Sequence, residues 1–194
     1  MPLKNWDNKT WISSKKYIKS FNNFLSKQIK LNRDSQILDI GCGRGKILGS
    51  LSSKLRLKNK PIGIDIEKHK DRDRRIHFKK INAIEFIKKN KKKFDLIMIK
   101  QTIHLLKFEE IKKLIYACKN QLNKNGKILI LTLEISHNEI PTFLLMKRKL
   151  KKSLDRDKKM IKFISKLYPK NKNKRLSFKV KISRDKYTEM IKNR

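Results

Sequence analysis

The chain has 194 residues and a formal net charge of +36, because 53 Lys and Arg residues face only 17 Asp and Glu residues. No run approaches the ~18 consecutive apolar residues of a membrane span, and the opening MPLKNWDNKT lacks the apolar segment of a secretory signal, so we expect a cytoplasmic protein. Cys42 and Cys118 are the only cysteines, which argues against a disulfide scaffold and structural zinc. We expect one domain without a metal.

The apolar residues before Pro141 recur at the spacing of alternating helices and strands. Residues 13–29 predict a helix that Ser13 or Ser14 caps. Short apolar runs predict buried strands, which fall at residues 35–40, 61–67, 76–81, 94–99 and 127–135. Helical spacing returns at residues 47–55 and 108–122, and NKNG before the last strand predicts a turn. This order predicts an α/β fold, a doubly wound and mostly parallel sheet with helices on both faces.

The last quarter of the chain is strongly basic, with 20 basic and four acidic residues from Lys147 to Arg194. Its apolar pattern predicts helical pieces near residues 144–154 and 161–167, a strand at residues 176–182 and a helix after it. A basic surface is the expected footprint of a nucleic-acid binder. An AT-rich coding sequence would also enrich Lys, and Lys without Arg and aromatic residues reads bases poorly. RNA therefore stays open as a partner, and the oligomeric state is left open.

Three glycines alternate with other residues in the segment DIGCGRG, directly after the first predicted strand. A Walker A phosphate loop does not fit, because two glycines are one residue too close and Ile47 replaces the Mg²⁺-binding hydroxyl. A dinucleotide-binding fingerprint fits weakly, because Lys46 stands at its third glycine. The pattern hhDhGxGxG instead resembles the first motif of class I S-adenosylmethionine-dependent methyltransferases, a Rossmann-like family.

The resemblance implies a binding site for the methionine and ribose parts of the cofactor. Asp39 would face the methionine ammonium, directly or through water. The backbone of Gly41, Cys42 and Gly43 would lie against the methionine and ribose. Asp65 ends the second predicted strand, and its carboxylate would accept hydrogen bonds from both ribose hydroxyls.

Later segments continue the resemblance in family order, over roughly residues 13–134. Ile66 would pack on the adenine. Asn82, followed by Ala83, stands where the family usually has an aspartate that contacts the adenine amino group, so this contact would be neutral. Lys100 follows the fourth predicted strand and would also lie beside the cofactor.

The loop after the fourth strand would meet the methyl acceptor. Enzymes that methylate adenine or cytosine amino groups carry [DNS]PP[YFW] there, whereas this chain has KQTIH, and no cysteine nucleophile for cytosine C5 is present. His104 is a candidate base because its ordinary pKa suits proton transfer near neutrality, and a histidine bonding locally at a helix start is the alternative. Lys100 is a candidate contact for a substrate carboxylate or phosphate, or an ordinary surface lysine.

The N-terminal aromatic residues Trp6, Trp11 and Tyr17 resemble a lid over cofactor and substrate in similar enzymes. A hydrophobic staple for the first helix is the alternative. We divide the chain into this lid and helix segment (residues 1–35), an S-adenosylmethionine-binding core (36–140) and a basic C-terminal segment of the same domain (141–194).

The resemblance implies a methyltransferase that uses S-adenosylmethionine, releases S-adenosylhomocysteine and needs no metal. The segment IKQTIHLL is most similar to enzymes with small-molecule acceptors; an RNA methyltransferase and a catalytically silent S-adenosylmethionine- or nucleic-acid-binding protein are the alternatives. The family builds seven strands, but no apolar run is left for the seventh, so we expect a truncated sheet in which residues 176–182 pair directly with the fifth strand. Cofactor binding would then persist while turnover weakens.

Overall fold

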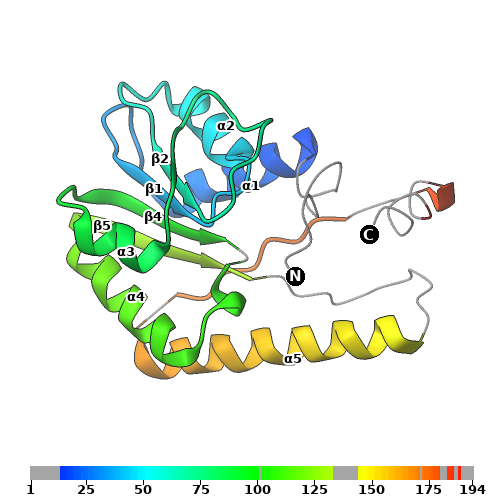
Figure 1. The fold of residues 1–194 in the computed structure, drawn as a ribbon. Helices are drawn as coiled ribbons and strands as arrows, with labels where there is room; N and C mark the ends of the chain where they lie inside the picture. Colours follow the sequence, from blue (N-terminus) through cyan, green and yellow to red (C-terminus); the bar gives the residue numbers. More distant parts are fainter. Residues whose placement is uncertain are drawn as a thin grey trace. The chain divides into compact units, whose positions relative to one another are not determined.

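The chain folds into two compact units, one made of residues 1–31 and 174–194 and the other of residues 32–173. Figure 1 labels their helices and strands. The larger unit contains the sheet, and the smaller one contains helix α1 (Lys15–Gln28). The computed structural model describes residues 14–100, 102–132, 144–170, 172–179, 183–185 and 188. Within these residues, no helix is both long and apolar enough to cross a membrane.

The larger unit is built on a five-stranded sheet in which all neighbouring strands are parallel. Its strands are β1 (Ile37–Ile40), β2 (Ile62–Asp65), β3 (His77–Lys80), β4 (Phe94–Lys100) and β5 (Leu122–Leu131). Their order, β3-β2-β1-β4-β5, reverses direction between β1 and β4. This order confirms the predicted doubly wound parallel sheet, because the chain fills one half of the sheet and then returns to fill the other.

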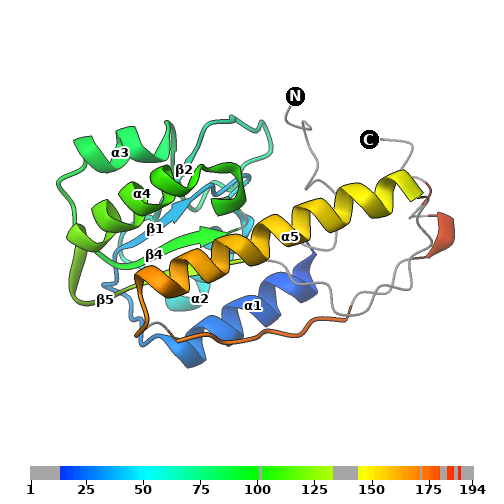
Figure 2. The ribbon, with the colours of Figure 1, turned by 90° about the horizontal axis from the view of Figure 1, so that it is seen from below.

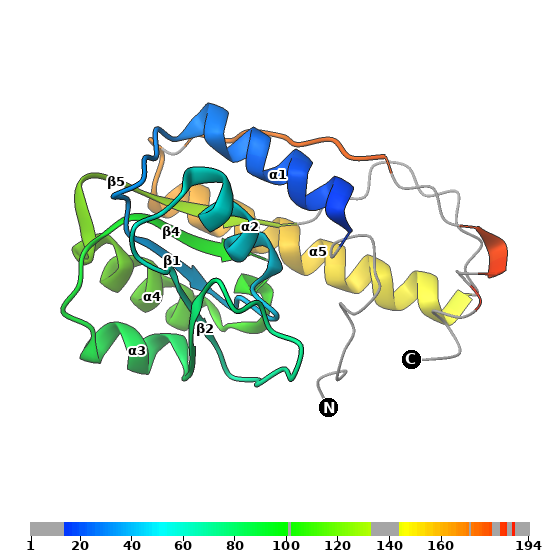
Figure 3. The same cartoon turned by 90° about the horizontal axis from the view of Figure 1, so that it is seen from above.

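Helices cover both faces of the sheet. Figure 3 shows α2 (Lys46–Leu55) on one face, and Figure 2 shows α3 (Ala83–Lys89) and α4 (Phe108–Asn120) on the other. Helix α5 (Leu144–Leu167) lies on the α4 side, where the rings of Phe108 and Phe163 are 4.9 Å apart.

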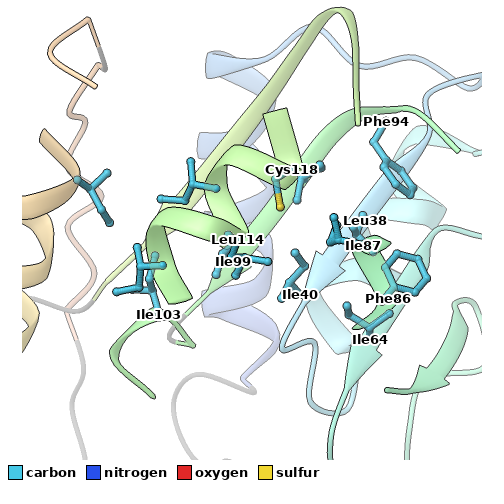
Figure 4. Packing of buried hydrophobic residues seen from close by; sticks show 14 of the residues in the cluster. Leu38, Ile40, Ile64, Phe86, Ile87, Phe94, Ile99, Ile103, Leu114 and Cys118 are labelled. Atoms are coloured by element: carbon cyan, nitrogen blue, oxygen red, sulfur yellow. The ribbon is translucent and has the colours of Figure 1, made fainter. Parts of the chain in front are cut away.

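The main hydrophobic core lies between the sheet and the helices α3, α4 and α5 (Figure 4). Alternate strand residues such as Leu38 and Ile40 of β1 and Ile99 of β4 point into it. Because strand side chains alternate between faces, Asp39 and Lys100 belong to the opposite face, the one that α2 covers. Both faces of β1 are buried, as predicted for a strand in a sheet with two helical layers.

The first helix begins where the sequence predicts. The Ser14 hydroxyl accepts a hydrogen bond from the Tyr17 N–H (3.2 Å), which makes Ser14 the N-cap of α1. Helix α3 was not predicted, because seven residues are too few to show a helical repeat.

Strand β5 begins before the predicted turn at NKNG. It starts at Leu122 beside Phe94, and the register then shifts so that Lys127 pairs with Leu96. The Asn123 side chain donates a hydrogen bond to Asp95 (2.7 Å). The turn prediction is therefore wrong, because a bulge absorbs these residues into the strand.

Two expectations for the C-terminal part are also wrong. The two helical pieces form one continuous helix α5, because no Gly or Pro interrupts residues 144–167 and Met160 and Ile164 anchor its second half in the core. Residues 176–179 form no strand. Instead Phe178 packs edge-on against Tyr17 in the smaller unit, with ring centroids 5.3 Å apart. The rest of the expected sixth strand, residues 180–182, lies outside the described residues.

Candidate functional site

Polar side chains gather at the carboxyl ends of three neighbouring strands. Asp39 is the third residue of β1, Asp65 ends β2 and Lys100 ends β4. Because β1 lies between β2 and β4, these three ends are adjacent. The sheet also changes its winding direction between β1 and β4, and open α/β sheets bind ligands at such a point.

The glycine loop after β1 has a backbone that ordinary residues avoid. Gly41, Gly43 and Gly45 have φ angles of +70°, +55° and +70°, in the left-handed region that favours glycine. The N–H groups of Gly41 and Cys42 both donate to the carbonyl of Ile64, at 2.9 and 3.0 Å. The loop is therefore tied to the end of β2.

The space beside two of these glycines is filled by the protein itself. A Cβ atom on Gly41 would lie 1.9 Å from Oγ1 of Thr102, and one on Gly45 would lie 2.2 Å from Cδ1 of Ile76. Close packing against the β4 loop and β3 therefore explains part of the glycine pattern.

Asp65 is fixed at the mouth of this loop. One carboxylate oxygen accepts the Gly43 N–H at 2.8 Å, and the other accepts the Glu67 N–H at 3.0 Å. Each carboxylate oxygen can accept a second hydrogen bond. Asp65 therefore has a set orientation and keeps the capacity to bind the two hydroxyls of a ribose.

Asp39 forms a buried ion pair with Lys100. The Lys100 ammonium donates to both carboxylate oxygens, and the side chains of Asp39 and Lys100 are only 1% and 9% exposed. Burial raises the pKa of the Asp39 carboxyl, and the neighbouring Lys100 ammonium opposes that rise. The sequence places both residues at the site, but their pairing follows only from the adjacency of β1 and β4.

Cys42 is inert in this setting. Burial, together with the negative charge of Asp39, raises the pKa of the Cys42 thiol far above its usual range. The thiol is therefore protonated at neutral pH and offers only its backbone and its volume to the site.

The predicted adenine contacts lie at the ends of β2 and β3. Ile66 directly follows β2 and is 56% exposed, which is unusual for a large apolar residue and leaves its side chain available for packing. Asn82 is exposed and caps α3, because its side-chain oxygen accepts the Ile84 N–H at 2.9 Å. Ala83 is the first residue of α3.

The loop after β4 forms the short helix η2 (Ile103–Leu105). Ile103 is buried in the core, whereas Leu105 is 67% exposed. The Thr102 hydroxyl donates to the Lys100 carbonyl at 2.9 Å and so shapes the turn out of the strand. His104 lies within η2, but the structure does not describe its side chain.

Of the three aromatic residues predicted to form a lid, the structure describes only Tyr17. Trp6 and Trp11 lie outside the described residues. Tyr17 is buried, and its ring contacts Phe21 of α1 and Phe178.

A family model described as "Methyltransferase domain" matches residues 31–193. The chain belongs to this methyltransferase domain family. A sequence comparison with curated proteins gave no match.

Solved structures of methyltransferases share the fold of this family member. The plantazolicin methyltransferase BpumL, in complex with a triazolic desmethylPZN analog and SAH, aligns with a TM-score of 0.51 and 26% identity over 65% of this chain and 49% of its own. A complex of BpumL with a pentazolic analog and SAH aligns with a TM-score of 0.60 and 21% identity, over 84% and 68%. An S-adenosylmethionine-dependent methyltransferase from Clostridium acetobutylicum aligns with a TM-score of 0.50 and 19% identity, over 58% and 49%. The matched part thus spans about half of the length of the first of these relatives.

Sequence reasoning missed the role of Arg44 in the glycine loop of this methyltransferase domain. The Arg44 side chain is 3% exposed, and its Nε donates to both oxygens of Asp71, at 2.7 and 2.8 Å. Burial alone would raise the pKa of the Asp71 carboxyl, but the hydrogen bond and charge of Arg44 lower it. The available signal in the sequence was an arginine inside the glycine loop, together with the segment DRD at residues 71–73, which offers two carboxylates.

The residues of this site fit one half of S-adenosylmethionine better than the other. The oriented carboxylate of Asp65 and the exposed Ile66 suit the adenosine half. Asp39 is the expected partner of the methionine ammonium, but it is already paired with the ammonium of Lys100. Within the described residues, no group of three or more His, Cys, Asp or Glu side chains is arranged to hold a metal.

Proposed function

We propose that this chain is an S-adenosylmethionine-dependent methyltransferase with a small-molecule acceptor. The observation that carries the proposal is the Asp65 carboxylate, which the Gly43 N–H orients beside the glycine loop at the switch point of the sheet. Structures of related fold contain SAH, the product of the same cofactor. The fold and the SAH of these relatives therefore both support the use of this cofactor.

In this proposal, the residues of the chain bind and orient. Asp65 accepts hydrogen bonds from the ribose hydroxyls, and Ile66 packs on the adenine, with Asn82 and Ala83 at its edge. The backbone of Gly41, Cys42 and Gly43 lies along the ligand. When bound, S-adenosylmethionine supplies an electrophilic methyl group on a positively charged sulfur, whose leaving form is neutral. The protein contributes mainly by positioning the reactants.

The acceptor is placed at the loop after β4. His104 is the proposed base for an acceptor that loses a proton, because it belongs to η2 in the loop that follows β4 and Lys100. The exposed Leu105 offers an apolar surface beside it. The plantazolicin methyltransferase BpumL was crystallised with a triazolic desmethylPZN analog and SAH, which supports a small organic acceptor here.

Cofactor binding tests the first half of the proposal. Calorimetry should detect S-adenosylhomocysteine binding, and Asp65→Ala should weaken it by about 1.5–3 kcal/mol, the range for hydrogen bonds to a charged group. Asp34→Ala is the matched control, because Asp34 lies at the other end of the strands in an exposed pair with Lys58. A wild-type protein that ignores millimolar S-adenosylhomocysteine, or equal losses in both variants, would contradict the proposal.

Methyl transfer from radiolabelled cofactor tests the second half. Fractionated metabolites and total RNA should be offered in parallel, because the described basic residues of α5 are all exposed and provide a surface for polyanions. We expect label in a small-molecule fraction. Label in RNA that survives physiological salt would instead identify an RNA methyltransferase.

A further inference from the structure

We infer that Lys100 is an internal competitor of the cofactor: its ammonium holds the Asp39 carboxylate in the place of the ligand's own ammonium, and binding requires the two to exchange. The inference rests on the proposed function, because it concerns how this chain admits S-adenosylmethionine. It differs from the roles expected of Lys100, which were direct contacts with cofactor or substrate.

The Asp39 carboxylate cannot be reached from solvent in this structure. Asp39 is completely buried, and the Lys100 ammonium lies against both of its carboxylate oxygens. Because no part of Asp39 is exposed, an ammonium from outside cannot reach it while Lys100 keeps this position. Either Lys100 moves, or the ligand ammonium finds another acceptor.

The two ammonium groups are chemically equivalent partners for Asp39. A lysine ammonium and the α-ammonium of methionine are both compact cations with three N–H donors. A carboxylate that suits one suits the other, so an exchange keeps the hydrogen bonds of Asp39 and the positive charge beside it. Two ammonium groups at this one buried carboxylate would instead compete for the same oxygens.

The Lys100 side chain can move without a change in the backbone. Lys100 is the last residue of β4, at the carboxyl end of this strand, and its ammonium is carried on a flexible four-carbon stem. The stem can swing toward solvent without moving the strand, because the backbone of β4 is held by its pairing with β1 and β5. Displacement of Lys100 is therefore a side-chain event.

The competition predicts that removing the lysine strengthens binding. Lys100→Met should bind S-adenosylhomocysteine about tenfold more tightly than the wild type, because the ligand ammonium no longer has to displace a lysine from Asp39. S-adenosylhomocysteine is the probe because its neutral sulfur adds no charge of its own. Lys58→Met is the matched control, since it removes the same charge from an exposed ion pair away from the site, and its affinity should equal that of the wild type.

A ligand without an ammonium isolates the cause. 5′-Methylthioadenosine carries the adenosine and the sulfur but no amino acid, so Lys100→Met should leave its affinity unchanged. An equal gain for both ligands would show a general effect of charge and overturn the inference. Weaker S-adenosylhomocysteine binding by Lys100→Met would also overturn it, because Lys100 would then hold the ligand carboxylate.

These two outcomes can be told apart from failure of the proposed function. In that case neither the wild type nor any variant would bind S-adenosylhomocysteine. Should Lys100→Met not fold, Lys100→Gln gives the same decision. Its neutral amide competes less well than an ammonium, so a gain of several-fold for S-adenosylhomocysteine alone is expected. No gain in a folded Lys100→Gln protein would overturn the inference.

Discussion

Two aspartate–lysine ion pairs flank β1 at its opposite ends, and they differ in almost everything except chemistry. Asp34 precedes the strand and pairs with Lys58, with side chains 58% and 51% exposed. Asp39 near the other end pairs with Lys100, and both are buried. Exposed pairs contribute little because water competes for both charges, whereas a buried pair depends on each partner to compensate the other. At the carboxyl end of the sheet, the charges of Asp39 and Lys100 therefore depend on each other. At the opposite end, water compensates the charges of Asp34 and Lys58.

The largest expected effect comes from breaking the buried pair. Lys100→Met leaves a buried carboxylate without its counterion, so we expect the free energy of unfolding at neutral pH to fall by about 3–5 kcal/mol. Lys58→Met should change it by about 0–1 kcal/mol, because its pair is exposed. Urea unfolding of both variants measures the two losses. Equal losses would remove the distinction between the ends.

The loss in Lys100→Met should depend on pH. Burial already raises the pKa of the Asp39 carboxyl in the wild type. Without the Lys100 ammonium, the pKa of Asp39 in the folded variant rises further above its value in the unfolded chain. A carboxyl group whose pKa is raised by folding destabilises the folded state at a pH above its folded-state pKa. It has no effect on stability at a pH below its unfolded-state pKa, about 3.9. The gap to the wild type should therefore shrink as the pH falls from 8 toward 4. A gap that widens on acidification would show that Asp39 is not the group left uncompensated.

A smaller effect is expected from the glycine loop. Gly41→Ala places a methyl group 1.9 Å from Oγ1 of Thr102 and holds alanine at a φ of +70°, which should cost about 2–4 kcal/mol of stability. Thr102→Ala in the same chain removes the nearest atom and should recover part of the loss. Thermal unfolding of the single and double variants gives the coupling. Strictly additive losses would mean that the loop does not pack on Thr102.

The smallest effect is expected at Asn82. Asn82→Asp keeps the cap of α3, so stability should change by less than about 0.5 kcal/mol. Affinity for S-adenosylhomocysteine should rise a few-fold, because a carboxylate accepts a stronger hydrogen bond from the adenine amino group. Asn82→Ser keeps the cap with a shorter side chain and should not gain affinity. Calorimetry with all three proteins decides whether Asn82 lies at the adenine.

The glycine loop and the aspartates at the strand ends could be predicted because their signals are local. Glycines that need a left-handed backbone and acids that end apolar strands are both visible within a few residues of sequence. The later part of the chain was predicted less well. The apolar spacing in residues 144–167 did not distinguish one helix from two. Residues 176–179 alternate like a strand, but Phe178 packs on Tyr17 of α1 instead.

The sequence by itself determined the existence of the five strands, the loop between β1 and α2, and the positions of Asp39 and Asp65 at strand ends, because these follow from nearest neighbours along the chain. Only the tertiary structure decided which charges meet. Asp39 and Lys100 are 61 residues apart, and Arg44 and Asp71 are 27 apart. Each pair forms because strand order brings the elements together, and local spacing carries no record of that order. The pairing of Asp39 with Lys100 is thus a property of the sheet.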